Sequence, residues 1–173
     1  MRLSSLVLGS LLALLPLQLS AQAAPKPLND ATIVAIFDAA NTTDIETGAL
    51  AMRRGASQKV RDFGKMLKTD HTMVRQLGRD LAKKLGVTPT PPSDRSAARA
   101  HAAAMKLLRP LTGKAFDRAF LQHEVAYHAS VLSAINTTLL PAISNAELKA
   151  LVVKVAPAFV AHQKGAEVLL RDL

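Results

Sequence analysis

The sequence from Ser57 to Gly86 is SQKVRDFGKMLKTDHTMVRQLGRDLAKKLG, and this stretch decides the fold. Its apolar residues recur at three- or four-residue intervals, which is the period of one face of an α-helix. They are Val60, Phe63, Leu67, Val74, Leu77, Leu81 and Leu85. Ser57 is a favourable N-cap, and Gly86 is a favourable residue just after a helix end. The stretch therefore predicts one long amphipathic helix with His71 on its apolar face.

Three further stretches have the same helical period. The first covers residues 30–54, is capped by Asn29 or Asp30 and stops at Gly55. Another covers residues 112–139, and Pro141 is expected to close it. The last is predicted to open at a capping box, Ser144-Asn145-Ala146-Glu147.

The connection between the second and third long helices has its own structure. Residues 87–93 contain three prolines and predict a linker, whereas residues 94–109 are rich in alanine and predict a shorter helix. No segment alternates between apolar and polar residues as a half-buried strand does. The predicted fold is all-α, a four-helix bundle with a short extra helix in the central crossover.

The first residues predict export. Arg2 precedes an apolar stretch from Leu3 to Leu19, and Ala21-Gln22-Ala23 is a cleavage site of the small-x-small type. We therefore predict a secretory signal peptide over residues 1–23, a short tether over 24–29 and one domain over 30–173. Cleavage near Ala23 would place the mature protein in the periplasm or outside the cell.

Composition limits the classes of partner. The chain has no cysteine, 3% aromatic residues and a net charge of +9. Because Lys and Arg are spread along the helices without stacking aromatics, a nucleic-acid partner is not expected. Weak contacts with anionic surfaces of the cell envelope are expected instead, and the oligomeric state stays open.

Each long helix also places one potential metal ligand on its apolar stripe. These ligands are Asp44, His71, His128 and His162, with Glu124 as an optional fifth. Imidazole nitrogens together with carboxylate favour a transition metal, so the sequence predicts a single zinc, iron or copper ion in the bundle core. The alternative is a polar layer without metal, in which histidines and carboxylates bond to one another and set the helix register.

Neighbouring polar residues are assigned other roles. Asp70 lies too far round its helix to join the cluster and is expected to serve as a partner across a helix interface. His123 is expected to face solvent, and His101 is expected to have no partner. Met66 and Met73 share one flank of their helix and are expected to fill the edge of the core.

Catalytic signatures are missing from the chain. There is no cysteine nucleophile, no nucleophile elbow and no glycine-rich phosphate loop. The sequence therefore favours a binding protein over an enzyme. The second hypothesis is a metal-free envelope stress or interaction protein whose basic surface binds anionic partners.

Several stretches resemble an exported bacterial family catalogued as domain of unknown function 4142. They are Asp44-Ile45-Glu46-Thr47-Gly48-Ala49-Leu50-Ala51, Val60-Arg61-Asp62-Phe63-Gly64, Asp70-His71, Phe116-Asp117-Arg118-Ala119-Phe120-Leu121, His128 and His162. The resemblance implies a ferritin-like four-helix bundle and covers about residues 31–170.

The chain departs from that family's pattern at two positions. Asp44 stands where a glutamate is usual, and Tyr127 stands where many members have an acidic residue. Ferritin-like proteins commonly hold two iron ions through Glu-x-x-His motifs, but this sequence has Glu124 and His128 four residues apart. The resemblance therefore implies the architecture and the three histidines of the cluster, and it does not imply an oxygen-activating di-iron site.

Overall fold

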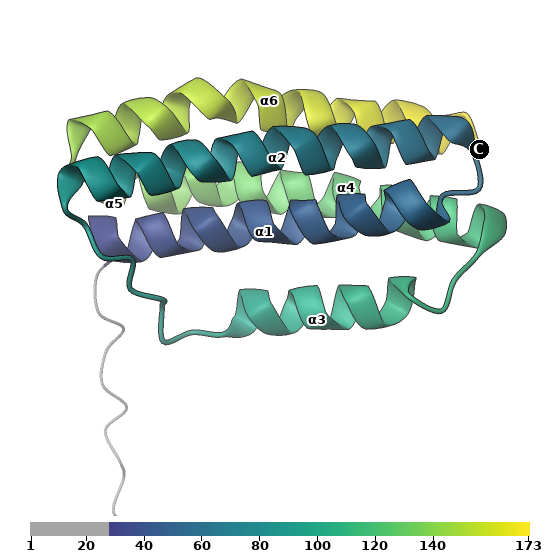
Figure 1. Ribbon diagram of the computed structural model, residues 1–173, viewed down its shortest axis with the longest axis horizontal. Helices are drawn as coiled ribbons and strands as arrows, with labels where there is room; N and C mark the ends of the chain where they lie inside the picture. The colour runs from purple at the N-terminus through teal and green to yellow at the C-terminus, as the bar shows by residue number, and fades with distance from the viewer. Residues whose placement is uncertain (1–27) are drawn as a thin grey trace, which may run out of the picture.

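Four long helices lie side by side in a computed structural model that describes residues 28–173 (Figure 1). They are α1 (Asp30–Arg54), α2 (Gln58–Leu85), α4 (Gly113–Ala134) and α6 (Ala146–Arg171). The predicted signal peptide and most of the predicted tether lie outside the described residues. A ferritin-like four-helix bundle is thus confirmed, and residues 28–173 contain no strand.

The crossover helix α3 (Ser96–Leu108) runs beside α1 on the outside of the bundle (Figure 1). Only Met105 and Leu108 of α3 are buried. The segments on either side of α3 are fixed to the bundle: Thr90 N–H donates to the Ala31 carbonyl at 3.0 Å, and the guanidinium of Arg54 donates to the Leu111 carbonyl at 3.1 Å. In the first two turns of α3 every residue except His101 is exposed, so this part of the helix is loosely packed.

Most helix ends agree with the sequence pattern, and two do not. Asn29 and Ser57 cap α1 and α2, because their side-chain oxygens accept backbone N–H groups of the first turn. The third long helix does not stop before Pro141. It passes through a π-helical turn, η1 (Ile135–Leu139), into the short α5 (Leu140–Ala142). Proline is tolerated there because the first turn of a helix does not use its N–H groups.

The predicted capping box at the start of the last helix is wrong by one residue. Asn145, not Ser144, is the N-cap of α6 and accepts the Leu148 N–H at 3.0 Å. The backbone N–H groups of Ser144 and Asn145 both donate to the Asp30 carboxylate, at 2.9 Å each. A carboxylate from α1 thus fixes the entry to α6, which local sequence does not reveal.

Two glycines allow α1 and α2 to approach closely. A Cβ atom on Gly64 would lie 2.7 Å from the Ala51 Cβ, and one on Gly48 would lie 2.7 Å from the Gly64 carbonyl oxygen. No side chain fits at either position without moving the helices apart. This contact lies one turn from Asp44 and so sets the distance between Asp44 and α2.

The bundle core has two apolar halves with a polar layer between them. One half contains Phe37, Val74, Val152 and Phe159, and the other contains Leu50, Phe63, Phe116, Phe120 and Ala166. Every long helix places at least one buried polar residue between the two halves. These residues are Asn41, Asp44, Thr47, His71, Glu124, His128 and His162. The layer therefore crosses the middle of the molecule.

One prediction about the packing of α2 is wrong. Met66 and Met73 are 39% and 58% exposed, so they do not fill the edge of the core as expected. Both lie on the outer side of α2, where no other helix covers them. In the described part of the chain, no helix has the length and hydropathy needed to cross a membrane.

Candidate metal centre

Five ionisable side chains from four different helices meet in the polar layer. α1 supplies Asp44, α2 supplies His71, α4 supplies Glu124 and His128, and α6 supplies His162. None of them is more than 3% exposed. A site closed on all sides must satisfy these groups internally, because water does not reach them.

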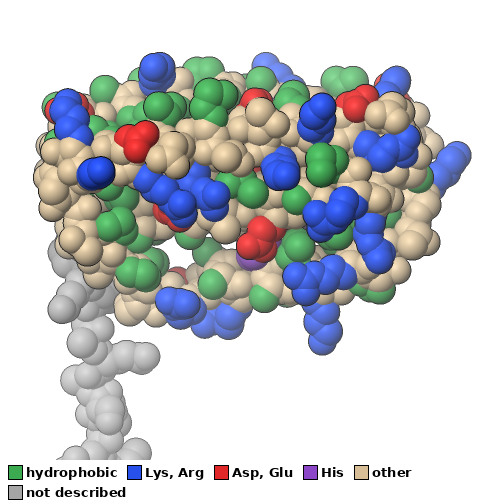
Figure 2. Space-filling model, in the orientation of Figure 1, with side chains coloured by type: hydrophobic (Ala, Val, Ile, Leu, Met, Phe, Trp, Pro, Cys, Tyr) green, Lys and Arg blue, Asp and Glu red, His purple; other side chains and the backbone are tan. Residues whose placement is uncertain are grey.

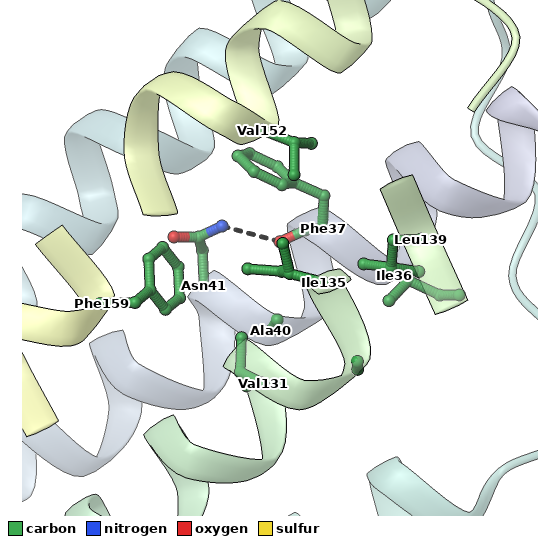
Figure 3. A pocket seen from close by; sticks show the side chains of 10 residues that line it. Ile36, Phe37, Ala40, Asn41, Val131, Ile135, Leu139, Val152 and Phe159 are labelled. Atoms are coloured by element: carbon green, nitrogen blue, oxygen red, sulfur yellow. Dashed lines mark hydrogen bonds between the residues drawn. The ribbon is translucent and has the colours of Figure 1, made fainter. Parts of the chain in front are cut away.

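The environment of His71 determines which ring nitrogen carries its proton. Its Nδ1 lies 2.9 Å from Oδ1 of Asn41. The amide nitrogen of Asn41 donates to the Phe37 carbonyl at 2.8 Å, so the amide oxygen is the atom that faces His71 (Figure 3). An amide oxygen only accepts hydrogen bonds. The Nδ1 of His71 is therefore the protonated nitrogen, and Nε2 keeps its lone pair.

His162 is oriented in the same way by a different acceptor. Its Nε2 lies 3.0 Å from Oδ2 of Asp70, so Nε2 carries the proton that the carboxylate accepts. Its other nitrogen, Nδ1, lies 3.1 Å from Nε2 of His71. When both rings are neutral, two lone pairs face each other at this distance. That arrangement is repulsive without a cation beside it.

His128 completes the set of three. Its Nδ1 donates to the backbone carbonyl of Glu124 at 2.9 Å, one turn earlier on α4. Its Nε2 is buried and has no hydrogen-bond partner among the described residues. One ring nitrogen from each of His71, His128 and His162 lies within 4.8 Å of the other two. Each ring thus donates outward and leaves a lone pair on its other nitrogen.

Two carboxylates lie beside the histidines. Both oxygens of Asp44 and both oxygens of Glu124 are buried without a hydrogen-bond partner in residues 28–173. Asp44 Oδ2 lies 3.5 Å from His71 Nδ1, and Asp44 Oδ1 lies 3.9 Å from His128 Nε2. Donor atoms of Asp44, Glu124 and His128 form a second group within 4.8 Å, so His128 belongs to both groups.

Burial shifts the pKa of four of these groups, Asp44, Glu124, His71 and His128, towards the neutral form. Burial, and then the nearby Glu124 carboxylate, raise the pKa of Asp44 well above its ordinary value. Burial raises the pKa of Glu124 to about 7. Burial also lowers the pKa of His71 to about 2 and that of His128 to about 4, with a further contribution from neighbouring rings. The lowered pKa values keep the lone pairs of His71 and His128 free, whereas the two carboxyl groups hold their protons more readily than they do in water.

The arrangement has the donor set of a transition-metal site. Three neutral imidazole nitrogens and one or two carboxylates suit zinc, iron or copper, and they suit calcium or magnesium poorly. The outer nitrogens are bonded to an amide, a backbone carbonyl and a carboxylate, as is usual for histidines that bind metal. The five residues that the sequence suggested as ligands form two overlapping groups of three that share His128, and each group could hold a metal ion.

Asn41 is a site residue that sequence reasoning missed. It is fully buried, and it orients His71. A signal was present, because Asn41 follows Phe37 by four residues and precedes Asp44 by three on the same helix face. Asp70 has the predicted role, since it bonds to His162 from outside the cluster.

The two remaining histidines differ from expectation. His101 has a partner: its Nε2 lies 2.8 Å from Oε2 of Glu46. His123 does not simply face solvent, because its Nε2 is buried and its ring stacks on Tyr127 with centroids 5.7 Å apart. Both corrections have one cause. α3 lies against this side of α1 and α4, and the sequence did not show where the crossover helix would lie.

Comparisons with known proteins agree with the fold. A crystal structure of a DUF305 fragment from Deinococcus radiodurans is similar to this chain, with a TM-score of 0.73 and 17% sequence identity. The similarity covers 85% of this chain and 99% of that one. No curated protein matches the sequence. The family model for the domain of unknown function DUF4142 matches residues 16–169. The chain therefore belongs to the DUF4142 family.

Proposed function

We propose that this protein is an exported, most simply periplasmic, binding protein that holds one transition-metal ion in the centre of its bundle. His71, His128, His162 and Asp44 bind the ion, and Glu124 serves as a fifth ligand. Zinc, iron and copper are the candidates, because imidazole and carboxylate together suit these ions. The protein is proposed to bind or carry the metal rather than to catalyse a reaction with it.

One observation carries the proposal. Three imidazoles donate their only N–H groups outward, and their remaining nitrogens converge beside two carboxylates that lack partners. A layer that only fixed helix register would satisfy its buried atoms, because an unpaired buried polar atom costs about 1–3 kcal/mol. A divalent cation satisfies the lone pairs and the carboxylates together.

The test is elemental analysis of protein that was purified without an affinity tag. We expect about one equivalent of zinc, iron or copper per chain. Adding the same ion to chelator-treated protein at about 100 times its dissociation constant should raise the melting temperature by roughly 5–10 °C. The His71→Gln variant should lose this response, whereas His101→Gln, a change outside the polar layer, should keep it. Protein that contains no metal and whose melting temperature is unchanged by all three ions would overturn the proposal.

A second candidate function rests on the surface. The net charge is +9, and Figure 2 shows Lys and Arg side chains distributed over the face formed by α1, α2 and α3. Such a surface favours weak association with anionic lipid or cell-wall polymer. The expected result is salt-sensitive binding to anionic vesicles that His71→Ala leaves unchanged. Binding that is insensitive to salt would argue against this candidate.

A further inference from the structure

A large cavity lies between α3 and the bundle. Its volume is about 1040 Å³, at the upper end of the range for small-molecule sites. α1 forms one wall, α3 with the preceding proline segment forms another, and α4 forms the third. Figure 2 shows the hollow between α3 and the rest of the molecule. The cavity adjoins the metal centre at Tyr127, whose ring centroid lies 6.0 Å from that of His128, but the inference does not depend on metal binding.

Small side chains keep this space open. Alanines line it from all three helices; they are Ala35, Ala39, Ala40, Ala97, Ala98, Ala100, Ala104, Ala126 and Ala134. α3 does not close over them, because the segments on either side of it are fixed to the bundle and it buries only Met105 and Leu108. An apolar hollow of this size on a soluble bundle marks a binding site more often than a packing defect.

The two ends of the cavity differ in chemistry. One end is lined by Val34, Ile36, Phe37, Val131 and three prolines, and its charged residues are Asp38, which pairs with Arg79, and the exposed Asp94 and Arg95. The other end lies about two helical turns further along α1 and contains Thr42, Thr43, Arg75, His101, His123 and Tyr127. At a rise of 1.5 Å per residue, the ends are roughly 10–15 Å apart. The site therefore fits a ligand that has an apolar chain and one polar head.

The polar end specifies the head group. His101 Nδ1 and His123 Nε2 are both buried without a hydrogen-bond partner in the part of the chain that the structure describes. Arg75 donates to the Thr42 hydroxyl at 3.1 Å and has no carboxylate within ion-pair distance there. By contrast, the carboxylate of Asp38 is engaged by Arg79, at 2.5 and 3.0 Å. The charged residues that line the whole cavity are three arginines and two aspartates, so an anionic head group is favoured.

We propose that the cavity under α3 binds a linear monocarboxylate amphiphile, that is, a free fatty acid. The carboxylate accepts from Nε2 of His123 and from Arg75, and the chain lies along the alanines towards Val34 and the proline segment. His101 does not donate to it, because Nε2 of that ring holds the proton that Glu46 accepts.

The chain carries its own reporter for this site. Tyr127 is the single tyrosine of a protein without tryptophan, and it lines the cavity. Dodecanoate is titrated into chelator-treated protein, below the concentration at which micelles form, while tyrosine emission is recorded. We expect a saturable change. Lengthening the chain by two methylenes should tighten binding by roughly tenfold.

Charge and shape are tested with matched pairs. Dodecan-1-ol and dodecylammonium should bind at least tenfold more weakly than dodecanoate. Arg75→Gln should remove most of that difference, and Arg53→Gln, which changes an exposed arginine outside the cavity, should not. Ala126→Leu fills the cavity and should weaken dodecanoate binding at least tenfold. Ala129→Leu, an equal change on the same helix outside the cavity, should bind like the parent.

Three results would overturn the proposal. One is the absence of a saturable response in a parent protein whose circular dichroism shows an intact fold. Another is equal binding of the carboxylate, the alcohol and the ammonium. The third is a concentration-dependent dimer that Ala126→Leu abolishes, because a second copy of the chain would then be the occupant.

Discussion

The polar layer and the cavity under α3 are the two places where buried side-chain atoms lack hydrogen-bond partners. Residues 28–173 contain seven such atoms, five in Asp44, Glu124 and His128 and two in His101 and His123. The layer is closed by packed aromatic rings, with Phe159 5.0 Å from the His71 ring centroid. The cavity is bounded by alanine and is open to a ligand of appreciable size.

The comparison shows how packing decides what a histidine does. In the layer each ring is held by an outer acceptor and its inner nitrogen has room for an ion only. In the cavity, His101 is held by Glu46 on one side and leaves its other nitrogen facing a much larger space. The same residue type is therefore proposed to bind a metal in one region and to lie beside an organic ligand in the other.

The largest expected effect comes from adding a charge to the layer. His71→Asp would place a third carboxylate beside Asp44 and Glu124 in a site without water, and we expect a loss of about 3–5 kcal/mol of unfolding free energy. His123→Asp, in the cavity, should cost less than about 1 kcal/mol, because its ring is only half-buried. Urea unfolding in the presence of chelator measures both. Equal losses would show that the two regions are equally accessible to solvent.

The next effect is the pH dependence of the metal-free layer. Burial raises the pKa of Glu124 from 4.5 to about 7, so its contribution to stability is present below pH 4.5 and is lost as the pH rises to 7. The Glu124→Gln variant does not titrate at this position. The parent should therefore lose up to about 3 kcal/mol relative to the variant between pH 4.5 and 7.5.

Urea unfolding at several pH values follows this difference. Glu167→Gln, which changes a carboxylate outside the layer, should run parallel to the parent at every pH. A constant difference between the parent and Glu124→Gln would mean that water reaches the layer.

A smaller effect is expected for an outer partner of the metal ligands. Asp70→Ala removes the acceptor that holds Nε2 of His162, and it should weaken metal binding by about 10–100-fold. Isothermal titration of the metal identified by elemental analysis measures the change. Asp80→Ala, on the same helix but away from the layer, is the control. Full affinity in Asp70→Ala would mean that packing alone orients His162.

The smallest effect on stability is expected in the cavity. Ala126→Leu adds a side chain to open space and should change the unfolding free energy by no more than about 0.5 kcal/mol. The same addition in the layer, for example Thr47→Leu, should cost about 1–3 kcal/mol, because Thr47 is fully buried in tight packing. Thermal unfolding of the two variants tests whether only the cavity has room.

Most of the fold was predictable because it depends on local periodicity and capping. The apolar stripes of α1, α2, α4 and α6 and the caps at Asn29 and Ser57 are visible in the sequence and agree with the structure. The exceptions have tertiary causes. The passage of the third helix beyond Pro141 depends on the turn η1, and the entry to α6 depends on Asp30, which lies more than 100 residues earlier.

The sequence predicted which ionisable residues lie in the candidate site, but it did not predict how their side chains are oriented. The five ionisable residues of the site lie on apolar stripes, and a polar residue on such a stripe must find a partner inside the bundle. The pattern of apolar residues does not show the rotamers of these side chains, and it does not show to which acceptor each histidine ring donates its N–H. Asn41 was therefore missed, His101 was wrongly predicted to have no partner, and His123 was wrongly predicted to face solvent.

The sequence by itself determined that four amphipathic helices exist and that each carries a polar group into the core, because helical periodicity is a local property. Only the tertiary structure decided that the inner nitrogens converge, that the two carboxylates lack partners and that α3 encloses a cavity. Those features depend on the distances between helices. Such distances are set by close contacts such as Gly48 with Gly64 and by hydrogen bonds across the bundle, which no single segment encodes.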